Sequence, residues 1–257
     1  MKILCLTPIK HLNGVYEHLE SFGDVSYAPE LEKEHFYSLD MSDYYIIFCN
    51  PNKQQYLLNE EVLGEFNGTI LTASTGLNHI DVEYCNEKGI KVLSLTKDML
   101  LLQDLPSTSE LAFGLMLSLL RRIPQSQKHV SEYNWDYTQF VGRQIKDLNI
   151  GIIGYGRLGK MMYDFCRAFG ANVVVYDPYK INKEMPLEYL ITHCDVISLH
   201  VHVTDETKYM LNKHSLGLEK ISTFGSVKGD CYIINTSRGE IVNEADIVEG
   251  LKSGRIT

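Results

Sequence analysis

The feature that most constrains the fold of this chain is a glycine-rich segment between two apolar runs. The first run, 149–153, stops at Gly154, and Gly156 and Gly159 follow at short spacing. Apolar residues then recur every three or four positions, which is typical of an amphipathic helix. A second apolar run follows and ends in Asp177. This order of strand, tight turn, helix and strand predicts a parallel α/β unit.

Each part of the segment has a physical role in binding a dinucleotide. Gly154 permits the tight turn, Gly156 lets the backbone approach a pyrophosphate, and Gly159 lets the helix pack against the strand. The helix opens at Arg157 and Leu158, and its N-terminus offers unpaired N–H groups and a positive dipole to that anion. The segment therefore predicts a dinucleotide-binding site that includes all five residues.

Asp177 predicts which dinucleotide is bound. Its carboxylate can accept hydrogen bonds from the hydroxyl groups of the adenosine ribose, and its charge would repel a 2′-phosphate. We therefore expect NAD rather than NADP as the cofactor. A methyltransferase also places an acid after its second strand, but its glycine loop is usually arranged differently, so that class is the weaker alternative.

Composition limits the other function classes. The formal net charge of −9 argues against general nucleic-acid binding, which needs a basic surface. The six cysteines are scattered, which favours reduced, buried thiols over disulfides or a metal site. The apolar run 111–120 is about half as long as a membrane span requires, and 1–9 is too short for an export signal. We expect a cytoplasmic protein that binds no nucleic acid, membrane or metal.

The alternation of apolar runs predicts two α/β units. The first, 1–104, should be a flavodoxin-like domain that carries the substrate, and the second, 105–257, a Rossmann-type doubly wound NAD-binding domain. The segment 96–106 breaks the pattern and is the expected crossing between them. In the first unit the expected strands are 2–8, 25–27, 45–49, 69–73 and 91–95, and the helical or turn-rich segments include 54–66 and 82–88.

The second unit should continue after the glycine segment with strands at 195–201 and 231–235. A helix at 243–253 should end at Gly254, and 255–257 resembles the opening of a further strand. The unit is therefore expected to be short at its C-terminal edge.

A long helix is predicted at 108–122, since Ser107 and Glu110 have the spacing of a capping box. Its body, 111–120, is apolar nearly all round, so it should be buried on more than one side. It is either an ordinary core helix or one shared between domains or subunits, and the sequence leaves these two possibilities equal. We expect a homodimer with this helix at or near the interface.

Several segments in order resemble the D-isomer-specific 2-hydroxyacid dehydrogenases, the family that includes phosphoglycerate dehydrogenase. They run from about residue 70 to the end, whereas 1–68 fits only a generic α/β pattern. The resemblance implies hydride transfer between the nicotinamide of NAD and C2 of a D-2-hydroxy acid or 2-oxo acid. The matching segments are 74–81, 110–124, the glycine segment with Asp177 and Pro178, 194–200, 234–242 and 244–254.

The resemblance also assigns site residues. Arg238 matches the family's catalytic arginine, and its guanidinium can hold a carboxylate with two parallel hydrogen bonds; the alternative is a surface arginine that caps the next helix. Ser74, Thr75 and Gly76 correspond to the loop whose backbone amides hold the substrate carboxylate, although the family often has a glycine in place of Ser74. Further cofactor contacts are implied for His200, Thr207 and Thr236.

One departure from the family remains. There, the glutamate and histidine that handle the proton lie beyond the helix 244–254, in a region that this sequence does not contain. We therefore expect a truncated family member that binds NAD(H) and turns over poorly. The alternative is an NAD(H)-binding regulatory or interaction protein without turnover. His79 is expected to be a polar residue before the next helix rather than a catalytic group, and the sequence does not identify the acid.

Overall fold

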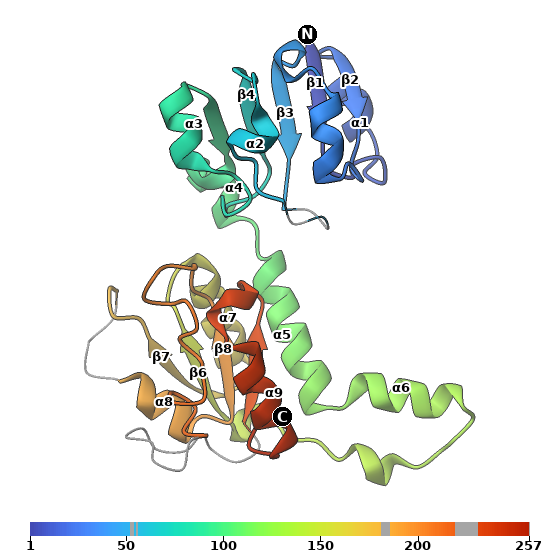
Figure 1. Cartoon of the computed structure of the whole chain (residues 1–257). Helices are drawn as coiled ribbons and strands as arrows, with labels where there is room; N and C mark the ends of the chain where they lie inside the picture. Colours follow the sequence, from blue (N-terminus) through green and yellow to red (C-terminus); the bar gives the residue numbers. More distant parts are fainter. Residues whose placement is uncertain (52–53, 55, 181–185, 219–230, 257) are drawn as a thin grey trace. The chain divides into compact units, whose positions relative to one another are not determined.

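The computed structural model describes residues 1–51, 54, 56–180, 186–218 and 231–256 of the chain (Figure 1). The chain divides into two compact units, Met1–Asp104 and Leu105–Thr257. Each unit is built on one sheet, and every strand pairing in both sheets is parallel. The predicted α/β class is therefore confirmed.

The first unit has five strands in the order β2-β1-β3-β4-β5. The reversal at β1 is the flavodoxin-like order that the sequence predicts. The strands are β1 (Lys2–Cys5), β2 (Asp24–Tyr27), β3 (Ile46–Cys49), β4 (Thr69–Thr72) and β5 (Lys91–Ser94). The helices are α1 (Val15–Glu20), α2 (Glu60–Leu63), α3 (Val82–Lys88) and α4 (Met99–Gln103), with 3₁₀ turns at Lys33–Ser38, Met41–Asp43 and Leu95–Lys97.

Local capping residues set the helix ends in this unit. The Asp81 carboxylate accepts a hydrogen bond from Tyr84 N at 3.0 Å, and Gly89 ends α3 with a φ of 73°. Within the segment 54–66, predicted as helical or turn-rich, the helix is limited to α2, which Asn59 caps at its start and Gly64, with a φ of 51°, ends. The expected crossing at 96–106 is not a plain loop, since it contains α4.

The second unit has four strands in the order β7-β6-β8-β9. They are β6 (Asn149–Ile153), β7 (Asn172–Tyr176), β8 (Val196–Leu199) and β9 (Tyr232–Asn235). The helices are α5 (Ser107–Leu120), α6 (Ile123–Ser131), α7 (Arg157–Ala168), α8 (Leu187–His193) and α9 (Glu244–Lys252), with 3₁₀ turns at Tyr137–Phe140, Ile145–Asp147 and Gly239–Ile241.

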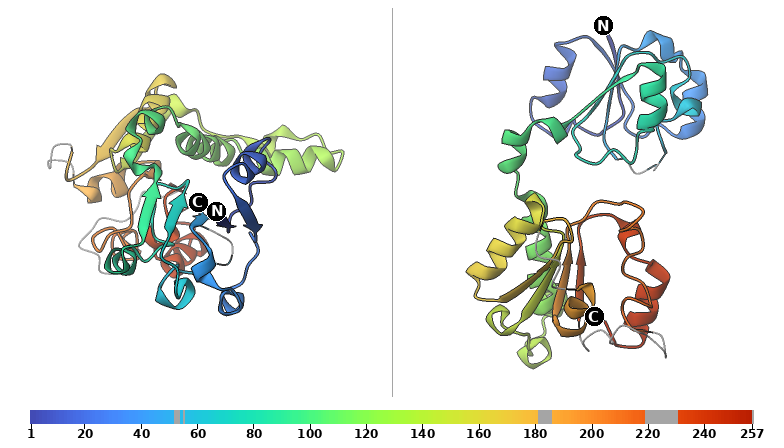
Figure 2. Two further views of the ribbon diagram at one scale, coloured as in Figure 1. Left: turned by 90° about the horizontal axis from the view of Figure 1, so that it is seen from above. Right: turned by 90° about the vertical axis from the view of Figure 1, so that its left-hand side faces the viewer.

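Helices cover both faces of this second sheet (Figure 2). Successive side chains of a strand point to opposite faces, so one strand contributes to two separate cores. Ile152 of β6 packs in a cluster with Met116 of α5 and Met162 of α7. Its neighbour Ile153 belongs to the other cluster, with Leu190 of α8. The unit is thus the doubly wound, Rossmann-type sheet that the sequence predicts.

The helix α5 departs from expectation in two respects. Its N-cap residue is Pro106 and no side chain caps it, so the predicted capping box of Ser107 and Glu110 is wrong. It is also buried on one side only, because the side chains on its leucine face remain accessible. The exposed fractions are 57% for Leu111, 42% for Leu115 and 39% for Leu119.

The remaining sequence expectations concern the C-terminal edge, the cysteines and the membrane. Ile256 forms a parallel bridge with Cys231 next to β9, as expected for the start of a further strand; Thr257 lies outside the described residues. All six cysteines are buried free thiols. In the described part of the chain, no helix combines the length and the apolar character that crossing a membrane requires.

Candidate functional site

A three-residue glycine turn joins β6 to α7. Gly154 has a φ of 94°, and a Cβ there would lie 2.5 Å from the carbonyl oxygen of His200. A Cβ on Gly159 would lie 1.9 Å from the carbonyl oxygen of Gly154. Both contacts are with backbone, so a side chain cannot be accommodated without moving a strand or the helix. By contrast, outside the two adjoining residues, a Cβ on Gly156 would meet only Lys180 Nζ among the described atoms, at 3.9 Å, which leaves open space above that glycine.

The turn lies at the topological switch point of the second sheet. Starting from β6, the chain adds β7 on one side and β8 on the other. Open α/β sheets bind ligands in the crevice at such a point, outside the carboxyl ends of the strands. His200 follows β8, and its backbone N donates to Ile153 O at 2.8 Å. The glycine turn and His200 therefore meet at the place where a ligand is expected.

Asp177 holds two loops together at the same edge. Its Oδ2 accepts a hydrogen bond from Tyr155 N at 2.8 Å, in the middle of the glycine turn. Its Oδ1 accepts from Tyr179 N at 3.0 Å and from Lys180 N at 3.1 Å. A carboxylate offers about four acceptor sites, so capacity remains for a ribose hydroxyl. The sequence did not reveal this structural role of Asp177.

Two buried polar atoms lie at the ends of neighbouring strands without a hydrogen-bond partner among the described residues. They are Nδ1 of His200 and Oγ1 of Thr236. The pairing of Leu199 with Asn235 brings the next residue of each strand to the same edge. Leaving a buried polar group without a hydrogen bond costs about 1–3 kcal/mol of stability. Such groups are therefore expected at places where a bound ligand supplies the missing partner.

The His200 ring is held in a neutral state. Its Nε2 lies 2.9 Å from Ser198 Oγ, and burial lowers its pKa to about 4. A neutral imidazole carries one donor and one acceptor nitrogen. The Nδ1 atom can therefore hydrogen-bond to a ligand without adding charge to the site.

Arg238 follows β9 and is half-buried. Its carbonyl oxygen accepts from Asn235 Nδ2 at 2.8 Å, and its Nη1 donates to Ser237 O at 2.9 Å. It precedes the 3₁₀ turn Gly239–Ile241, but no side chain caps that turn. The alternative role as a capping residue therefore has no support in the structure.

Three other predicted cofactor residues make contacts within the protein. Arg157 Nη1 donates to Leu105 O at 2.5 Å, and Leu158 O accepts from Ser109 Oγ at 2.9 Å. Thr207 Oγ1 donates to His202 O at 2.5 Å, which closes its own loop. These side chains and carbonyls fix the surroundings of the glycine turn and of the loop after β8.

The predicted substrate loop lies in the first unit, at the carboxyl end of β4. Gly76 N donates to Ser74 Oγ at 3.2 Å, so the serine that replaces a family glycine closes a tight turn with Thr75 at its centre. His79 Nε2 lies 3.2 Å from Thr72 Oγ1. His79 precedes α3, whose cap is Asp81, so it does not cap the helix itself.

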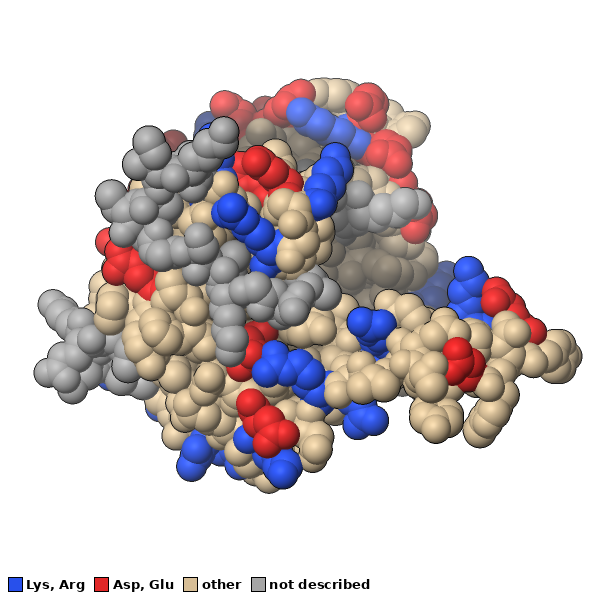
Figure 3. Space-filling model, turned by 90° about the horizontal axis from the view of Figure 1, so that it is seen from below, with Lys and Arg blue, Asp and Glu red and all other residues tan. Residues whose placement is uncertain are grey.

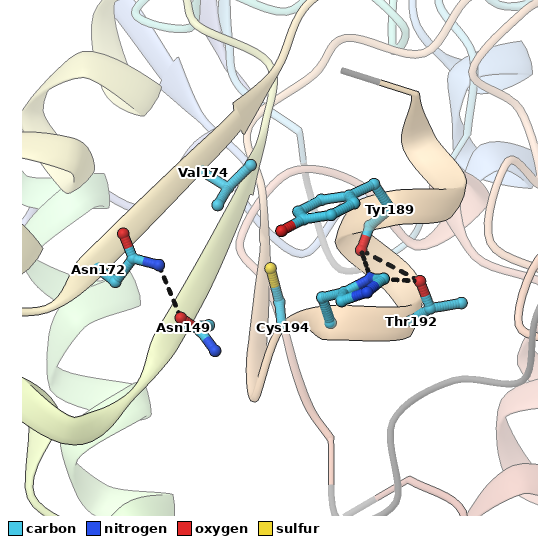
Figure 4. Close-up of a pocket in the computed structure, with 7 residues that line it drawn as sticks. Asn149, Asn172, Val174, Tyr189, Thr192 and Cys194 are labelled. Atoms are coloured by element: carbon cyan, nitrogen blue, oxygen red, sulfur yellow. Dashed lines mark hydrogen bonds between the residues drawn. The ribbon is translucent and has the colours of Figure 1, made fainter.

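A cavity of about 270 Å³ lies at the opposite edge of the second sheet. Asn149 and Asn172, the first residues of β6 and β7, form one wall with their amide groups hydrogen-bonded at 2.7 Å, and Tyr189 and Thr192 of α8 form another (Figure 4). Because it lies at the amino ends of the strands, it is separate from the glycine turn, and we assign it no function.

Charged groups are mixed on one face of the molecule. On the face shown in Figure 3, the basic side chains of the described residues alternate with acidic ones and form no continuous basic surface. Within the same residues, no three His, Cys, Asp or Glu side chains gather as a metal site would require.

Comparison with known families places both units. The model described as D-isomer specific 2-hydroxyacid dehydrogenase, NAD binding domain, matches residues 113–257. The model of the catalytic domain of the same family matches residues 7–98.

Individual relatives are longer than this chain. A hydroxypyruvate reductase of Thermotoga maritima is 33% identical over 192 residues, which cover 73% of this chain and 58% of that protein. A D-3-phosphoglycerate dehydrogenase of Methanocaldococcus jannaschii is 29% identical over 266 residues, covering 100% of this chain and 47% of that protein. The chain thus spans about half the length of these curated relatives.

Solved structures share the fold at lower sequence identity. A D-lactate dehydrogenase from Aquifex aeolicus, complexed with NAD and lactic acid, is 24% identical with a TM-score of 0.76, over 100% of this chain and 74% of that one. An NAD-dependent formate dehydrogenase from Staphylococcus aureus, in complex with NAD, is 24% identical with a TM-score of 0.80, over 100% of this chain and 79% of that one.

The residues of the second unit fit a bound dinucleotide. The space above Gly156 would be filled by a Cβ in any other residue, and it adjoins the N-terminus of α7. His200 Nδ1 and Thr236 Oγ1, which have no hydrogen-bond partner among the described residues, lie at the same sheet edge. A pyrophosphate would fit the open space above Gly156. Polar groups further along the dinucleotide would supply hydrogen bonds to His200 and Thr236.

Proposed function

Because this chain belongs to the D-isomer specific 2-hydroxyacid dehydrogenase family, we propose that it catalyses hydride transfer at C2 of a D-2-hydroxy acid or 2-oxo acid. Its cofactor is NAD, since residues 113–257 form the NAD-binding domain of that family. One observation carries the proposal most directly. The glycine turn, His200 and Thr236 meet at the carboxyl edge of one sheet, with two buried polar atoms lacking a partner among the described residues.

In this proposal the residues of the second unit bind different parts of NAD. The amides at Gly156 and the N-terminus of α7 hold the pyrophosphate. Asp177, which keeps free acceptor capacity, takes a hydroxyl of the adenosine ribose. His200 and Thr236 supply hydrogen bonds to polar groups beyond the pyrophosphate. When bound, NAD would accept the hydride from C2, or NADH would donate it, while the residues named here bind and orient the two reactants. The proton of the C2 hydroxyl is handled in the family by a glutamate and a histidine that match no position of this sequence.

Two groups are proposed to bind the acid. The Arg238 guanidinium can hold a carboxylate or polarise a C2 carbonyl, and its backbone is fixed by Asn235. The backbone amides of Thr75 and Gly76 serve the substrate carboxylate in the family. Here the Gly76 amide is already bonded to Ser74 Oγ at 3.2 Å, so the acid must compete with that serine.

The substrate class can be narrowed by assay. The names of the relatives point to hydroxypyruvate, D-3-phosphoglycerate and lactate as probes, together with their oxidised or reduced partners. We expect NADH to bind and one of the 2-oxo acids to bind the NADH complex, both measured by calorimetry. We expect NADH oxidation, followed by absorbance, to be slow, because the residues that handle the proton in the family match no position of this sequence. NADH binding without binding or reduction of any acid would contradict the dehydrogenase proposal but not the cofactor assignment.

Arg238 variants provide the matched control for this assay. Arg238→Lys keeps the charge but loses the bidentate geometry, and Arg238→Gln loses both. We expect each to weaken acid binding strongly while NADH binding stays within about twofold. An equal loss of NADH affinity would assign Arg238 to the structure of the cofactor site instead.

We also propose that the protein is a homodimer that uses α5. The accessible leucines 111, 115 and 119 follow at intervals of four residues and so form one apolar stripe on the helix. A stripe of this kind on a helix marks an association surface. Light scattering at micromolar concentration should give twice the mass of the chain, and Leu115→Glu should give a monomer. Leu251→Glu, at an accessible leucine of α9, is the control; a monomeric unmodified protein refutes the proposal.

We further place the protein in the cytoplasm. The support is the state of the cysteines, because all six are buried free thiols. Proteins of oxidising compartments typically use cysteine in disulfides. Fractionation of cells that express a tagged chain tests this placement.

A further inference from the structure

A lysine that the sequence did not assign lies over the glycine turn. The Lys180 Nζ atom is 3.9 Å from the position that a Cβ on Gly156 would occupy, and no other described atom outside the adjoining residues Tyr155 and Arg157 lies within 4 Å of it. Gly156 is the residue at which the backbone can approach a ligand most closely. The ammonium group therefore borders the open space in which an anion would be held by the N-terminus of α7.

The backbone of Lys180 is fixed to the same turn. Its N–H donates to Asp177 Oδ1 at 3.1 Å, while Asp177 Oδ2 accepts from Tyr155 N at 2.8 Å. One carboxylate thus connects the glycine turn to the loop that carries the lysine. The position of Lys180 relative to Gly156 follows from these hydrogen bonds as well as from its own side-chain conformation.

The other cations of the turn are engaged elsewhere. Arg157 donates to Leu105 O at 2.5 Å, and Lys160 Nζ lies over the Tyr155 ring, 5.6 Å from its centroid. Within the described part of the chain, Lys180 has no ion-pair partner. Lys180 Nζ therefore borders the space above Gly156 without an ion pair to a described residue, whereas Arg157 and Lys160 make the contacts just given.

We propose that Lys180 is a cofactor-binding residue whose ammonium group contacts the pyrophosphate of the dinucleotide. This rests on the proposed function, since it concerns the same NAD site. The pyrophosphate carries two negative charges, and the chain has a net charge of −9, so association needs a local cation. A 2′-phosphate is not the expected partner, because Asp177 occupies the ribose side of the turn and repels it.

The experiment measures binding, independently of turnover. Calorimetry with NADH, NADPH, ADP-ribose and adenosine should be carried out on the unmodified chain and on Lys180→Gln. We expect Lys180→Gln to weaken NADH and ADP-ribose by about tenfold, as for the loss of one charge-assisted hydrogen bond. Adenosine, which has no phosphate, should bind both proteins equally. The difference between the two proteins should shrink at high salt, because salt screens exposed charges.

Two matched variants distinguish the loss of the Lys180 charge from a general effect on the fold. Lys180→Arg keeps the charge and should retain most of the affinity. Lys146→Gln removes an exposed lysine from the same unit and should leave NADH affinity unchanged. Equal affinity of Lys180→Gln and the unmodified protein for NADH overturns the proposal. So does a loss confined to NADPH, which would assign the lysine to a 2′-phosphate.

Failure of the wider proposal gives a different result. An unmodified chain that binds neither NADH nor ADP-ribose overturns the cofactor assignment itself, and Lys180 with it. Binding of both ligands without any dependence on Lys180 overturns only the role of the lysine.

Discussion

The two units share the same arrangement of their first four strands but connect the first strand to the first helix in different ways. In the first unit a long loop, 6–14, leads from β1 to α1. In the second unit the glycine turn 154–156 is the whole connection between β6 and α7. Only the short turn brings the N-terminus of a long helix directly to the end of the central strand, where an anion can use its free N–H groups.

The glycines in or next to the two connections also have different structural roles. Gly14 has a φ of 76°, but a Cβ there would meet nothing within 4 Å. A Cβ at position 159 would lie 1.9 Å from Gly154 O, because α7 packs closely on the turn. Accordingly α7 buries Met162 and Cys166, whereas α1 has no buried residue. The same sheet order therefore yields a dinucleotide site only where the helix is held against the strand.

The largest effect is expected from Gly159→Ala. The added methyl group must push the helix away from the turn, since its nearest neighbour is backbone. We expect a loss of at least about 3 kcal/mol in the free energy of unfolding, together with NADH binding too weak to measure by calorimetry.

The control is Gly14→Ala in the first unit. It carries only the strain of a positive φ, which costs about 1–2 kcal/mol, and it should leave NADH affinity unchanged. If both variants were equally stable and bound NADH equally, close packing at the glycine turn would not distinguish the two units.

A smaller effect on the free energy of unfolding is expected when the pH is lowered, because His200 is buried in its neutral form. The folded-state pKa of His200 is about 4, against an ordinary value of 6.5. Between these values the unfolded chain takes up a proton that the folded chain does not, so stability is lost as the pH falls through this window. From pH 7 to pH 5 the His200 contribution amounts to about 2 kcal/mol.

Two histidine variants test that contribution by chemical denaturation at several pH values. His200→Gln should flatten the dependence of stability on pH between about 4 and 6.5. His18→Gln, at an exposed histidine of the first unit, should leave the dependence as it is. An unchanged slope in His200→Gln would show that the ring is accessible to protons in the folded state.

Features with local causes could be predicted from the sequence. The helix predicted at 82–88 matches α3 because Asp81 and Gly89, both adjacent to it, set its ends. The glycine turn was equally clear, since its spacing is itself the signal. The capping box at Ser107 failed because Pro106 takes the N-cap position, and spacing alone does not decide which residue precedes the first turn.

Features that depend on contacts between distant segments were missed. The position of Lys180 next to the glycine turn is fixed in part by three hydrogen bonds to Asp177, which no local pattern reveals. His200 Nδ1 and Thr236 Oγ1, which have no partner in the described part of the chain, come to one sheet edge only when β8 and β9 pair. A basic residue shortly after the acid was the one available signal for Lys180.

The smallest effect concerns the choice of cofactor, where Asp177 has both an electrostatic and a structural role. The unmodified protein should bind NADH more tightly than NADPH, because the carboxylate repels a 2′-phosphate. Asp177→Ala should narrow that preference by about tenfold, as expected for one removed charge. It should also destabilise the turn, because three backbone N–H groups lose their acceptor.

Asp177→Asn separates the electrostatic role from the structural one, since its amide oxygen can still accept from Tyr179 and Lys180. It should narrow the preference as much as Asp177→Ala while losing less stability in thermal unfolding. Equal affinity of the unmodified protein for NADH and NADPH, measured by calorimetry, would refute the selectivity proposed for Asp177 and leave only its structural role in joining the two loops.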